Sequence, residues 1–357
     1  MDFPTPEPVR LALHDLIDAA DLGYPGWLTG TPLRVAFADR MRCRFGWSLD
    51  PTRIRETNEV VQGVQLAVYF GTNPGDAIAV HAPTYPPFLK ALTAMGRCVL
   101  NIPMIDNPAG WVFDIRRLEY HLRNARCRAF LLVNPHNPTG RVFNADELAA
   151  LAQLAERHDM LIISDEIHAD LVYPPHQHIP IASLPGMAAR TVTLSSASKA
   201  FNLAGVRCAV AHIGPERLLA RWDEQPGNLY GRANIFGVAA TLAAWRNGDD
   251  WLARAITHLD NQRHLLADLL VARLPDARHH LVQASYLAWI DFRPLGLGPD
   301  PADRLAKQAG VALTSGLPFG LGGDGFARLN FATSTHLLSE IIGRMGRAVS
   351  TTTDQRG

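Results

Sequence analysis

Three polar side chains have the right types to carry out chemistry together, and each follows a short apolar run of the chain: Asn137, Asp165 and Lys199. A carboxylate can balance positive charge on a ligand, an amide can hydrogen-bond a ligand oxygen, and a lysine amine can act as a nucleophile. Each residue considered alone also has a plainer interpretation: a tight surface turn, a capped loop and a solvated lysine. The hypothesis of a shared site therefore depends on whether the fold brings the three together.

The elements that must position these side chains alternate between strands and helices over about residues 60–211. Short apolar runs predict buried strands at 77–81, 129–133, 160–164 and 191–194. Asn144, with Glu147 three residues later, predicts a capped helix between the second and third strands. This order implies right-handed crossovers and a mainly parallel sheet, in which ligand sites lie beyond the carboxyl ends of the strands. All three candidate side chains follow such ends.

Further segments near the strand ends could hold an anion or an aromatic ligand. Gly63, in Gln62-Gly-Val-Gln65, follows a candidate strand and opens a helix, whose N–H groups favour an anion. Ser196 and Ser198 place two hydroxyls beside the lysine, and Tyr85 offers a ring on a proline-rich loop. One glycine is a weak signal, however, and Tyr85 alone is compatible with simple packing.

The pattern changes after about residue 251. A smaller α+β domain is predicted there by a long helix over 258–274, alternating strands at 286–292 and 326–331, and a last helix from about 335. With 357 residues the chain is long enough for two domains. We expect a large domain over 25–253, a small domain built from 1–24 and 254–350, and a polar tail at 351–357.

Composition excludes several classes of protein. Lys and Arg number 34, and so do Asp and Glu, so the chain lacks the basic field expected of a nucleic-acid-binding protein. No apolar run reaches the roughly 18 residues of a membrane span, and the N-terminus lacks the basic and apolar regions of a signal peptide. The cysteines form no C-x-x-C pair, which argues against a zinc site and favours the reducing cytoplasm. We expect no metal, nucleic acid or membrane partner.

The joint order of the candidate residues is more informative than any one of them. A helix start, an aromatic loop, an asparagine turn, an acid and a lysine follow successive strands. In this order the chain resembles the fold-type I pyridoxal 5'-phosphate (PLP) enzymes of the aminotransferase class I/II family over nearly its whole length. The resemblance implies an α/β fold, with a mainly parallel seven-stranded sheet between helices in the large domain and a smaller α+β domain.

The amino-acid sequences of these motifs are similar to those of the MalY/PatB branch of that family. The segments that carry this likeness are Met1-Asp-Phe3, Asn134-Pro-His-Asn-Pro-Thr-Gly140, Ser164-Asp-Glu-Ile-His-Ala-Asp170, Ser198-Lys-Ala-Phe-Asn-Leu-Ala-Gly205, Tyr286-Leu-Ala-Trp-Ile-Asp291 and Phe326-Ala-Arg-Leu-Asn330. Members of the branch are cystathionine β-lyases and cysteine-S-conjugate β-lyases. The resemblance therefore implies a carbon–sulfur β-lyase that gives pyruvate, ammonia and a thiol such as homocysteine.

The resemblance also implies a role for each residue around the cofactor ring. Lys199 would hold PLP covalently and, once displaced, would remove the Cα proton of the substrate, and Asp165 would pair with the pyridine nitrogen. Tyr85 would stack on the ring, His168 would lie near it, and Asn137 would hydrogen-bond the phenolic oxygen and contact substrate. Lys199, Asp165 and Tyr85 would be the catalytic residues.

The resemblance assigns further residues to the phosphate and to the substrate. The phosphate would be held by Gly63, Val64, Gln65, Ser196, Ser198, Arg207 and, from the neighbouring subunit of a homodimer, Tyr24. Arg328 would bind the substrate carboxylate as a two-pronged fork.

Two features depart from the branch. Arg207 falls where aminotransferases carry a phosphate-binding arginine that the lyase branch commonly lacks. The chain also begins inside the usual opening of the branch, so we expect either a late start or the absence of a further N-terminal segment.

Two other functions remain open. The same lysine, acid and arginine could serve an aminotransferase, which differs in the fate of the substrate rather than in the residues that hold the ring. A regulatory binding protein without turnover is a third hypothesis, but such a scaffold needs none of these three residues.

Overall fold

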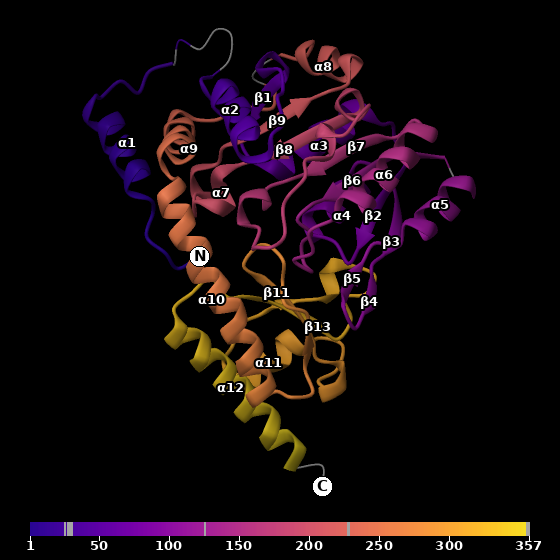
Figure 1. Cartoon of the computed structure of the whole chain (residues 1–357), viewed down its shortest axis with the longest axis vertical. Coiled ribbons are helices and arrows are strands. Elements are labelled where there is room, and N and C mark those ends of the chain that lie inside the picture. The colour runs from indigo at the N-terminus through magenta and orange to yellow at the C-terminus, as the bar shows by residue number, and fades with distance from the viewer. Residues whose placement is uncertain (25, 27–30, 125, 227–228, 355–357) are drawn as a thin grey trace.

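The computed structural model describes residues 1–24, 26, 31–124, 126–226 and 229–354, arranged around one large and one small sheet (Figure 1). The helices of this described part are α1 (Glu7–Asp18), α2 (Leu33–Phe45), α3 (Val60–Gly71), α4 (Pro86–Ala94), α5 (Ile115–Asn124), α6 (Ala145–Arg157), α7 (Ala197–Ala200), α8 (Glu216–Asp223), α9 (Ile235–Asn247), α10 (Asp249–Arg273), α11 (Pro301–Ala309) and α12 (Thr335–Asp354). Its strands are β1 (Ile54–Thr57), β2 (Ala77–Ala82), β3 (Cys98–Pro103), β4 (Ile105–Asn107), β5 (Gly110–Val112), β6 (Cys127–Val133), β7 (Leu161–Asp165), β8 (Thr191–Ser195), β9 (Ala209–Ile213), β10 (Arg278–His279), β11 (Leu287–Asp291), β12 (Thr314–Ser315) and β13 (Phe326–Asn330).

The larger sheet has the strand order β1-β9-β8-β7-β6-β2-β3. Strands β8, β7, β6, β2 and β3 run parallel, whereas β9 pairs antiparallel with both β8 and β1. The prediction of a mainly parallel seven-stranded sheet is confirmed, and the four predicted strands appear as β2, β6, β7 and β8. Because these strands share one direction, the residues that follow them meet at one edge of the sheet.

Alternate residues of the parallel strands face two separate apolar layers. On β6, Leu131 packs in a layer that contains residues of α3, α4 and α8, while Phe130 and Leu132 pack in a layer that contains residues of α5 and α6. Burial on both faces explains why these strands appear in the sequence as unbroken apolar runs. The predicted cap of α6 is also present, since Asn144 Oδ1 accepts from Glu147 N at 2.9 Å and Glu147 Oε2 accepts from Asn144 N at 2.8 Å.

The smaller sheet is antiparallel and has the order β10-β11-β13-β12. It lies below the larger sheet in Figure 1, with α10, α11 and α12 beside it. The predicted strands and the last helix appear there as β11, β13 and α12. The long helix begins at Asp249 rather than near His258, so the expected domain boundary at 253/254 falls inside α10.

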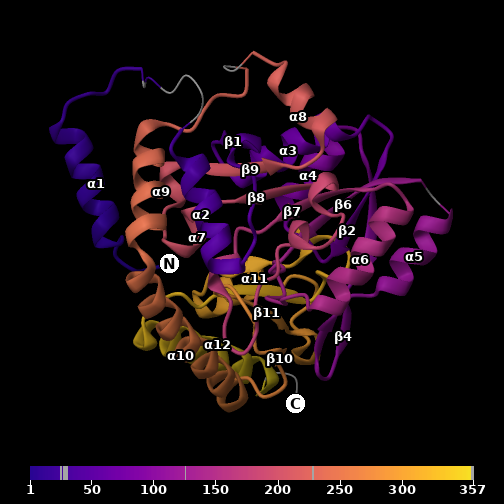
Figure 2. The ribbon, with the colours of Figure 1, turned by 45° about the horizontal axis from the view of Figure 1, so that its top comes forward.

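The N-terminal residues contact both parts of the molecule. Helix α1 lies beside α9, as both views show (Figures 1 and 2). The segment before it reaches the smaller part, where Asp2 N donates to Ala332 O at 2.9 Å and the Phe3 ring meets His258 edge-on. Because residues 1–24 are shared in this way, the division into a large and a small domain at the expected bounds remains a proposal.

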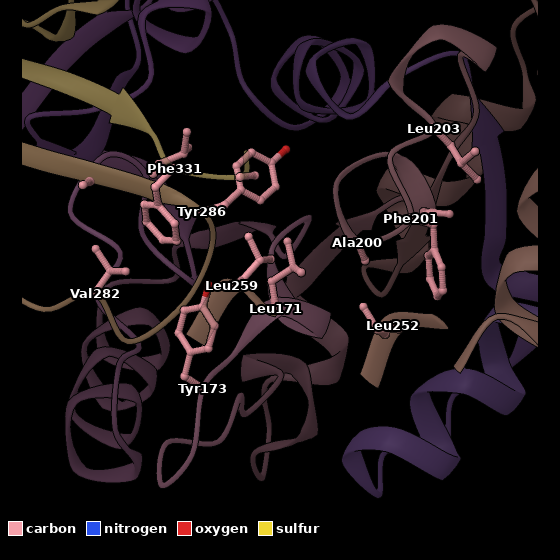
Figure 3. Packing of buried hydrophobic residues seen from close by; sticks show 14 of the residues in the cluster. Leu171, Tyr173, Ala200, Phe201, Leu203, Leu252, Leu259, Val282, Tyr286 and Phe331 are labelled. Carbon is pink, nitrogen blue, oxygen red and sulfur yellow. The ribbon is translucent and has the colours of Figure 1, made fainter. Parts of the chain in front are cut away.

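One apolar cluster joins the loops after β7 and β8 to the smaller sheet (Figure 3). Tyr173 follows β7, Phe201 follows α7, and both belong to the cluster that contains Leu259 of α10 and Tyr286. The hydroxyl of Tyr173 also donates to Ser285 O at 2.5 Å. The segments that follow the candidate acid and lysine are therefore held by buried packing against the smaller sheet and α10.

The C-terminal end differs from the expectation in one respect. A polar tail is predicted from residue 351, but α12 continues to Asp354, and residues 355–357 lie outside the described residues. Among the residues that are described, no helix is both long and apolar enough to cross a membrane. All four cysteines, Cys43, Cys98, Cys127 and Cys208, are free thiols.

Candidate active site

Asp165 is the last residue of β7 and is buried at the edge where the parallel strands end, with 5% of its surface exposed. Its Oδ1 accepts a hydrogen bond from Ile167 N at 3.0 Å. Burial raises the pKa of Asp165 to about 7, and the charge of Glu166 adds to this, whereas the Ile167 N–H and the Lys199 ammonium act against it. In the described part of the chain no cation pairs with this carboxylate within 4 Å, so it is suited to a ligand that brings its own positive charge.

Lys199 lies in the short helix α7, one strand away from Asp165. Strands β7 and β8 pair in parallel with Asp165 opposite Leu194, and α7 begins three residues after Leu194. Burial lowers the pKa of Lys199, the positive charge of Arg328 lowers it further, and Asp165 opposes both effects. The structure therefore brings the predicted lysine and acid into one electrostatic environment, in which the pKa of the lysine amine is lowered.

Arg328 reaches this region from β13 of the smaller sheet. Its Nη1 donates to Asn137 Oδ1 at 2.8 Å, and its guanidinium carbon lies 5.1 Å from the centre of the Phe319 ring. Burial lowers the pKa of Arg328, while Tyr85 and Tyr286 act in the opposite direction. The arginine and the asparagine, which lie 191 positions apart, thus form one polar unit between the two sheets.

Tyr85 and His168 are the two remaining residues that were predicted to lie at the cofactor ring. Tyr85 precedes α4, and burial raises the pKa of its hydroxyl, which Arg328 counteracts. His168 is 3% exposed, its Nδ1 has no hydrogen-bond partner in the described structure, and burial together with Lys199 and Arg328 lowers its pKa to about 3. His168 is therefore neutral and keeps a free ring nitrogen beside the candidate site.

The helix start that was predicted to hold an anion is placed differently. α3 begins at Val60, so Gly63 N already donates to Glu59 O at 3.1 Å, and the N–H groups of Val64 and Gln65 lie inside the helical hydrogen-bond ladder. A Cβ on Gly63 would lie 2.3 Å from Leu194 Cδ2, so this glycine allows α3 to pack on β8. The prediction that Gly63 opens the helix is wrong, because the free N–H groups at this helix start are those of residues 60–62. The phosphate contact of Gly63, Val64 and Gln65 itself stays a prediction.

Ser196 and Ser198 were both predicted to bind the phosphate, but their hydroxyls make different contacts. Ser196 caps α7, accepting from Ser198 N at 3.0 Å, and its hydroxyl donates to Cys208 O at 2.5 Å. Ser198 Oγ lies 2.7 Å from Ser196 Oγ and is partly exposed, so Ser198 is the hydroxyl that can turn toward a ligand. Arg207 forms an ion pair with Glu59 at the start of α3, which places it at the same end of the helix.

Tyr24 is fully exposed, and the described residues of this chain do not test its predicted contact across a dimer. The residues directly around it, 25 and 27–30, lie outside the described residues. Its role therefore stays a prediction.

Sequence reasoning missed two residues that support the site. Phe319 lies against Arg328 through a fold-dependent contact, and no motif in the sequence marks it. Tyr286 belongs to a predicted strand and to a motif shared with the MalY/PatB branch, but no role was predicted for its side chain; burial raises the pKa of its hydroxyl to about 12, partly offset by Arg328. Its ring also meets His168 at 6.2 Å, so it forms one wall of the site.

The sequence profile of the aminotransferase class I and II family matches residues 2–345. The chain is 35% identical to cystathionine β-lyase PatB of Bacillus subtilis, an alignment that covers 98% of this chain and 91% of that protein. It superposes on the PLP-bound C–S lyase of Staphylococcus hominis with a TM-score of 0.93 at 29% identity, covering 98% and 91% of the two chains. For N-succinyldiaminopimelate aminotransferase of Mycobacterium tuberculosis the TM-score is 0.87 at 29% identity, covering 97% and 91%. The chain belongs to the aminotransferase class I and II family.

Proposed function

We propose that the chain is a PLP-dependent carbon–sulfur β-lyase that acts on cystathionine or a related cysteine S-conjugate. The observation that carries this proposal is the convergence of Lys199, Asp165 and the Arg328–Asn137 pair on one buried region between the two sheets. The similarity to cystathionine β-lyase PatB over nearly the whole chain supports the choice of reaction.

The donor set fits PLP. Asp165 is a buried carboxylate that lacks a paired cation among the described residues, and a protonated pyridine nitrogen would supply that charge. Lys199 provides an amine of lowered pKa for the aldehyde, and Asn137 keeps an amide NH₂ for the phenolic oxygen because its carbonyl oxygen is taken by Arg328. When bound, PLP supplies an electron sink for the carbanion at the substrate Cα.

The chain's own residues would then bind, orient and move protons. Arg328 would hold the substrate carboxylate by a bidentate contact, and the ring of Tyr85 would pack on the cofactor face. Lys199 Nζ would take the proton from Cα. The Cβ–S bond breaks, the sulfur leaves as a thiol with one proton, and the remaining three-carbon product takes up water to give pyruvate and ammonia.

The phosphate would lie at the start of α3. The free N–H groups of residues 60–62 and the hydroxyl of Ser198 would donate to it. Arg207, which pairs with Glu59 at the start of α3, would add positive charge there, and Ser196 would orient α7 through its cap. We further propose that the enzyme is a homodimer in which Tyr24 reaches the phosphate of the partner, and that it acts in the reducing cytoplasm, which suits its four free cysteines.

An aminotransferase is the second candidate. The position of Arg207 and the similarity to N-succinyldiaminopimelate aminotransferase favour it. Both reactions use the same proton transfer from Cα, and they differ in whether a leaving group departs from Cβ. A regulatory protein without turnover is disfavoured, because such a scaffold would need none of Lys199, Asp165 and Arg328.

Two parallel reactions distinguish the lyase from the aminotransferase. The protein loaded with PLP is mixed with cystathionine, and in a parallel reaction with a 2-oxo acid and an amino donor. We expect pyruvate, ammonia and homocysteine in the first reaction and little exchange of amino groups in the second. Amino exchange without release of thiol would overturn the lyase and establish the aminotransferase.

A further inference from the structure

A cavity lies at the opposite edge of the larger sheet from the candidate active site. Its volume is about 260 Å³, close to the lower end for small-molecule sites. Leu161, which lines it, begins β7, and Asp165 ends the same strand. At a rise of about 3.3 Å per residue these two positions are about 13 Å apart, so the cavity is separate from the proposed cofactor site.

Four arginines from β6, α8 and the segment before β8 converge on this cavity. They are Arg128 at the start of β6, Arg190 just before β8, and Arg217 and Arg221 on α8. The one acidic residue in the lining is Asp159, whose side chain is 85% exposed and lies 3.8 Å from Arg128 and 3.6 Å from Arg190. Such exposed pairs at long distance neutralise little charge, so the cavity keeps an excess of positive charge.

The guanidinium groups have spare hydrogen-bonding capacity. Arg217 is exposed and makes no hydrogen bond or ion pair with any described residue. Arg221 uses Nη1 for Phe70 O at 2.5 Å, and Arg190 uses Nη1 for Ala155 O at 3.2 Å. The two last contacts fix the side chains in place and leave their other N–H groups to donate. Planar forks held in this way match the oxygens of a phosphate or carboxylate.

The rest of the lining is apolar. Phe70, Leu161, Leu218 and Pro215 contribute to it, and Leu161 and Leu218 close over Gly71, where an added Cβ would lie 2.4 Å and 3.1 Å from their methyl groups. A free inorganic ion would leave this apolar surface in contact with water, whereas a ligand with an apolar body would cover it.

We propose that this cavity binds a small organic phosphate monoester, with its phosphate held by the arginines and its apolar body against Phe70, Leu161 and Leu218. The volume limits the ligand to a single ring or a short chain. Nothing in the proposed lyase reaction uses this site, and the proposal stands whichever reaction the enzyme performs.

The test uses phenyl phosphate as the probe and the PLP-loaded enzyme, so that the proposed cofactor site is filled. Isothermal titration calorimetry measures the dissociation constant of phenyl phosphate. Phenol, which has only the apolar ring, and inorganic phosphate, which has only the anion, are titrated separately. We expect phenyl phosphate to bind more tightly than either. Equal affinity of phenol or of inorganic phosphate, or no saturable binding of phenyl phosphate, would overturn the proposal.

Variants locate the binding. Arg217→Gln and Arg217→Glu should weaken phenyl phosphate progressively, by about tenfold for the charge reversal, because a charged hydrogen bond is lost. Arg217 is exposed and unpaired with described residues, so both variants should unfold at the wild-type temperature. Arg116→Glu on α5 makes the same charge change at an exposed residue away from the cavity and should bind normally. An equal effect of Arg217→Glu and Arg116→Glu would place the binding elsewhere and refute the site.

Discussion

The guanidinium of Arg328 donates from Nη1 to the side-chain oxygen of Asn137 at 2.8 Å. Because arginine has only donors, this contact fixes which end of the amide faces it, and the NH₂ of Asn137 points to the remaining side. The residue expected to bind the substrate carboxylate and the residue expected to bind the cofactor oxygen therefore hold each other in place. A change in either one should affect both functions.

Asn137→Ala tests this coupling. It removes the acceptor that orients Arg328, so we expect the KM for the amino acid to rise as well as the visible absorption of the bound cofactor to shift. Steady-state kinetics and an absorption spectrum of the same preparation measure the two effects. A spectral shift with an unchanged KM would contradict the proposed role of the pair.

Arg328→Lys keeps the positive charge but removes the planar guanidinium that can bind a carboxylate through two hydrogen bonds. We expect a loss of about 1.5–3 kcal/mol in substrate binding, which is about 10- to 150-fold in KM, with a smaller effect on kcat. Kinetics with cystathionine measure it. Wild-type KM in this variant would exclude Arg328 as the carboxylate-binding residue.

Asp165→Asn should reduce turnover by orders of magnitude, because the charge that balances the protonated ring is lost. It should also change the stability of the cofactor-free protein with pH. The pKa of Asp165 is about 7 in the fold against 3.8 in the reference state, so the stabilising preference for the protonated form is complete below pH 3.8 and is lost as the pH rises through about 7.

Urea unfolding of the cofactor-free wild type and Asp165→Asn at two pH values therefore measures what the charge on Asp165 costs in stability. At pH 8 the asparagine variant should be more stable than wild type, by at most about 4 kcal/mol for a shift of this size, and near pH 4 the difference should disappear. Equal stability of wild type and Asp165→Asn at both pH values would show that burial does not destabilise the charged form of Asp165.

His178 and Glu166 form a buried pair directly behind Asp165. Their side chains are 0% and 2% exposed, and His178 Nε2 lies 2.9 Å from Glu166 Oε2. His178→Ala leaves that carboxylate oxygen without a partner, so we expect a loss of about 1–3 kcal/mol in the free energy of unfolding, measured in urea. Glu166→Gln in the same background should recover part of it, because a neutral amide is less costly to bury.

The exposed pair of His280 and Asp106 is the matched control. Its nitrogen and oxygen lie 2.7 Å apart, but the side chains are 29% and 40% exposed. His280→Ala should therefore cost less than about 1 kcal/mol. If the two histidine variants were equally destabilised, burial would not be the source of the effect.

The sequence was informative where position follows from a local pattern or from the order of the strands. Asp165 and Lys199 follow adjacent parallel strands, and parallel pairing alone brings their strand ends to one edge. The capping box of Asn144 and Glu147 is likewise local, and it marks the start of α6 correctly.

Prediction failed where position depends on neighbouring elements. α3 begins at Val60 after Glu59, whose side chain makes no cap hydrogen bond, so the sequence carries no sign of this start, and Gly63 was taken for it. The contact between Phe319 and Arg328 exists only after a loop of the smaller part folds against β13, which no local pattern encodes. The position of the N-terminal residues could not be predicted for the same reason, since α1 packs on α9, more than two hundred residues away.

The most direct test of the central claim is the location of the covalent bond to PLP. The holoenzyme is reduced with borohydride, digested, and the modified peptide is sequenced by mass spectrometry, with Lys199→Ala and the exposed-site variant Lys90→Ala treated in parallel. We predict a pyridoxyl group on Lys199 in wild type and in Lys90→Ala, and none in Lys199→Ala. A pyridoxyl group on any other lysine of the wild-type enzyme, or none at all, would contradict the account.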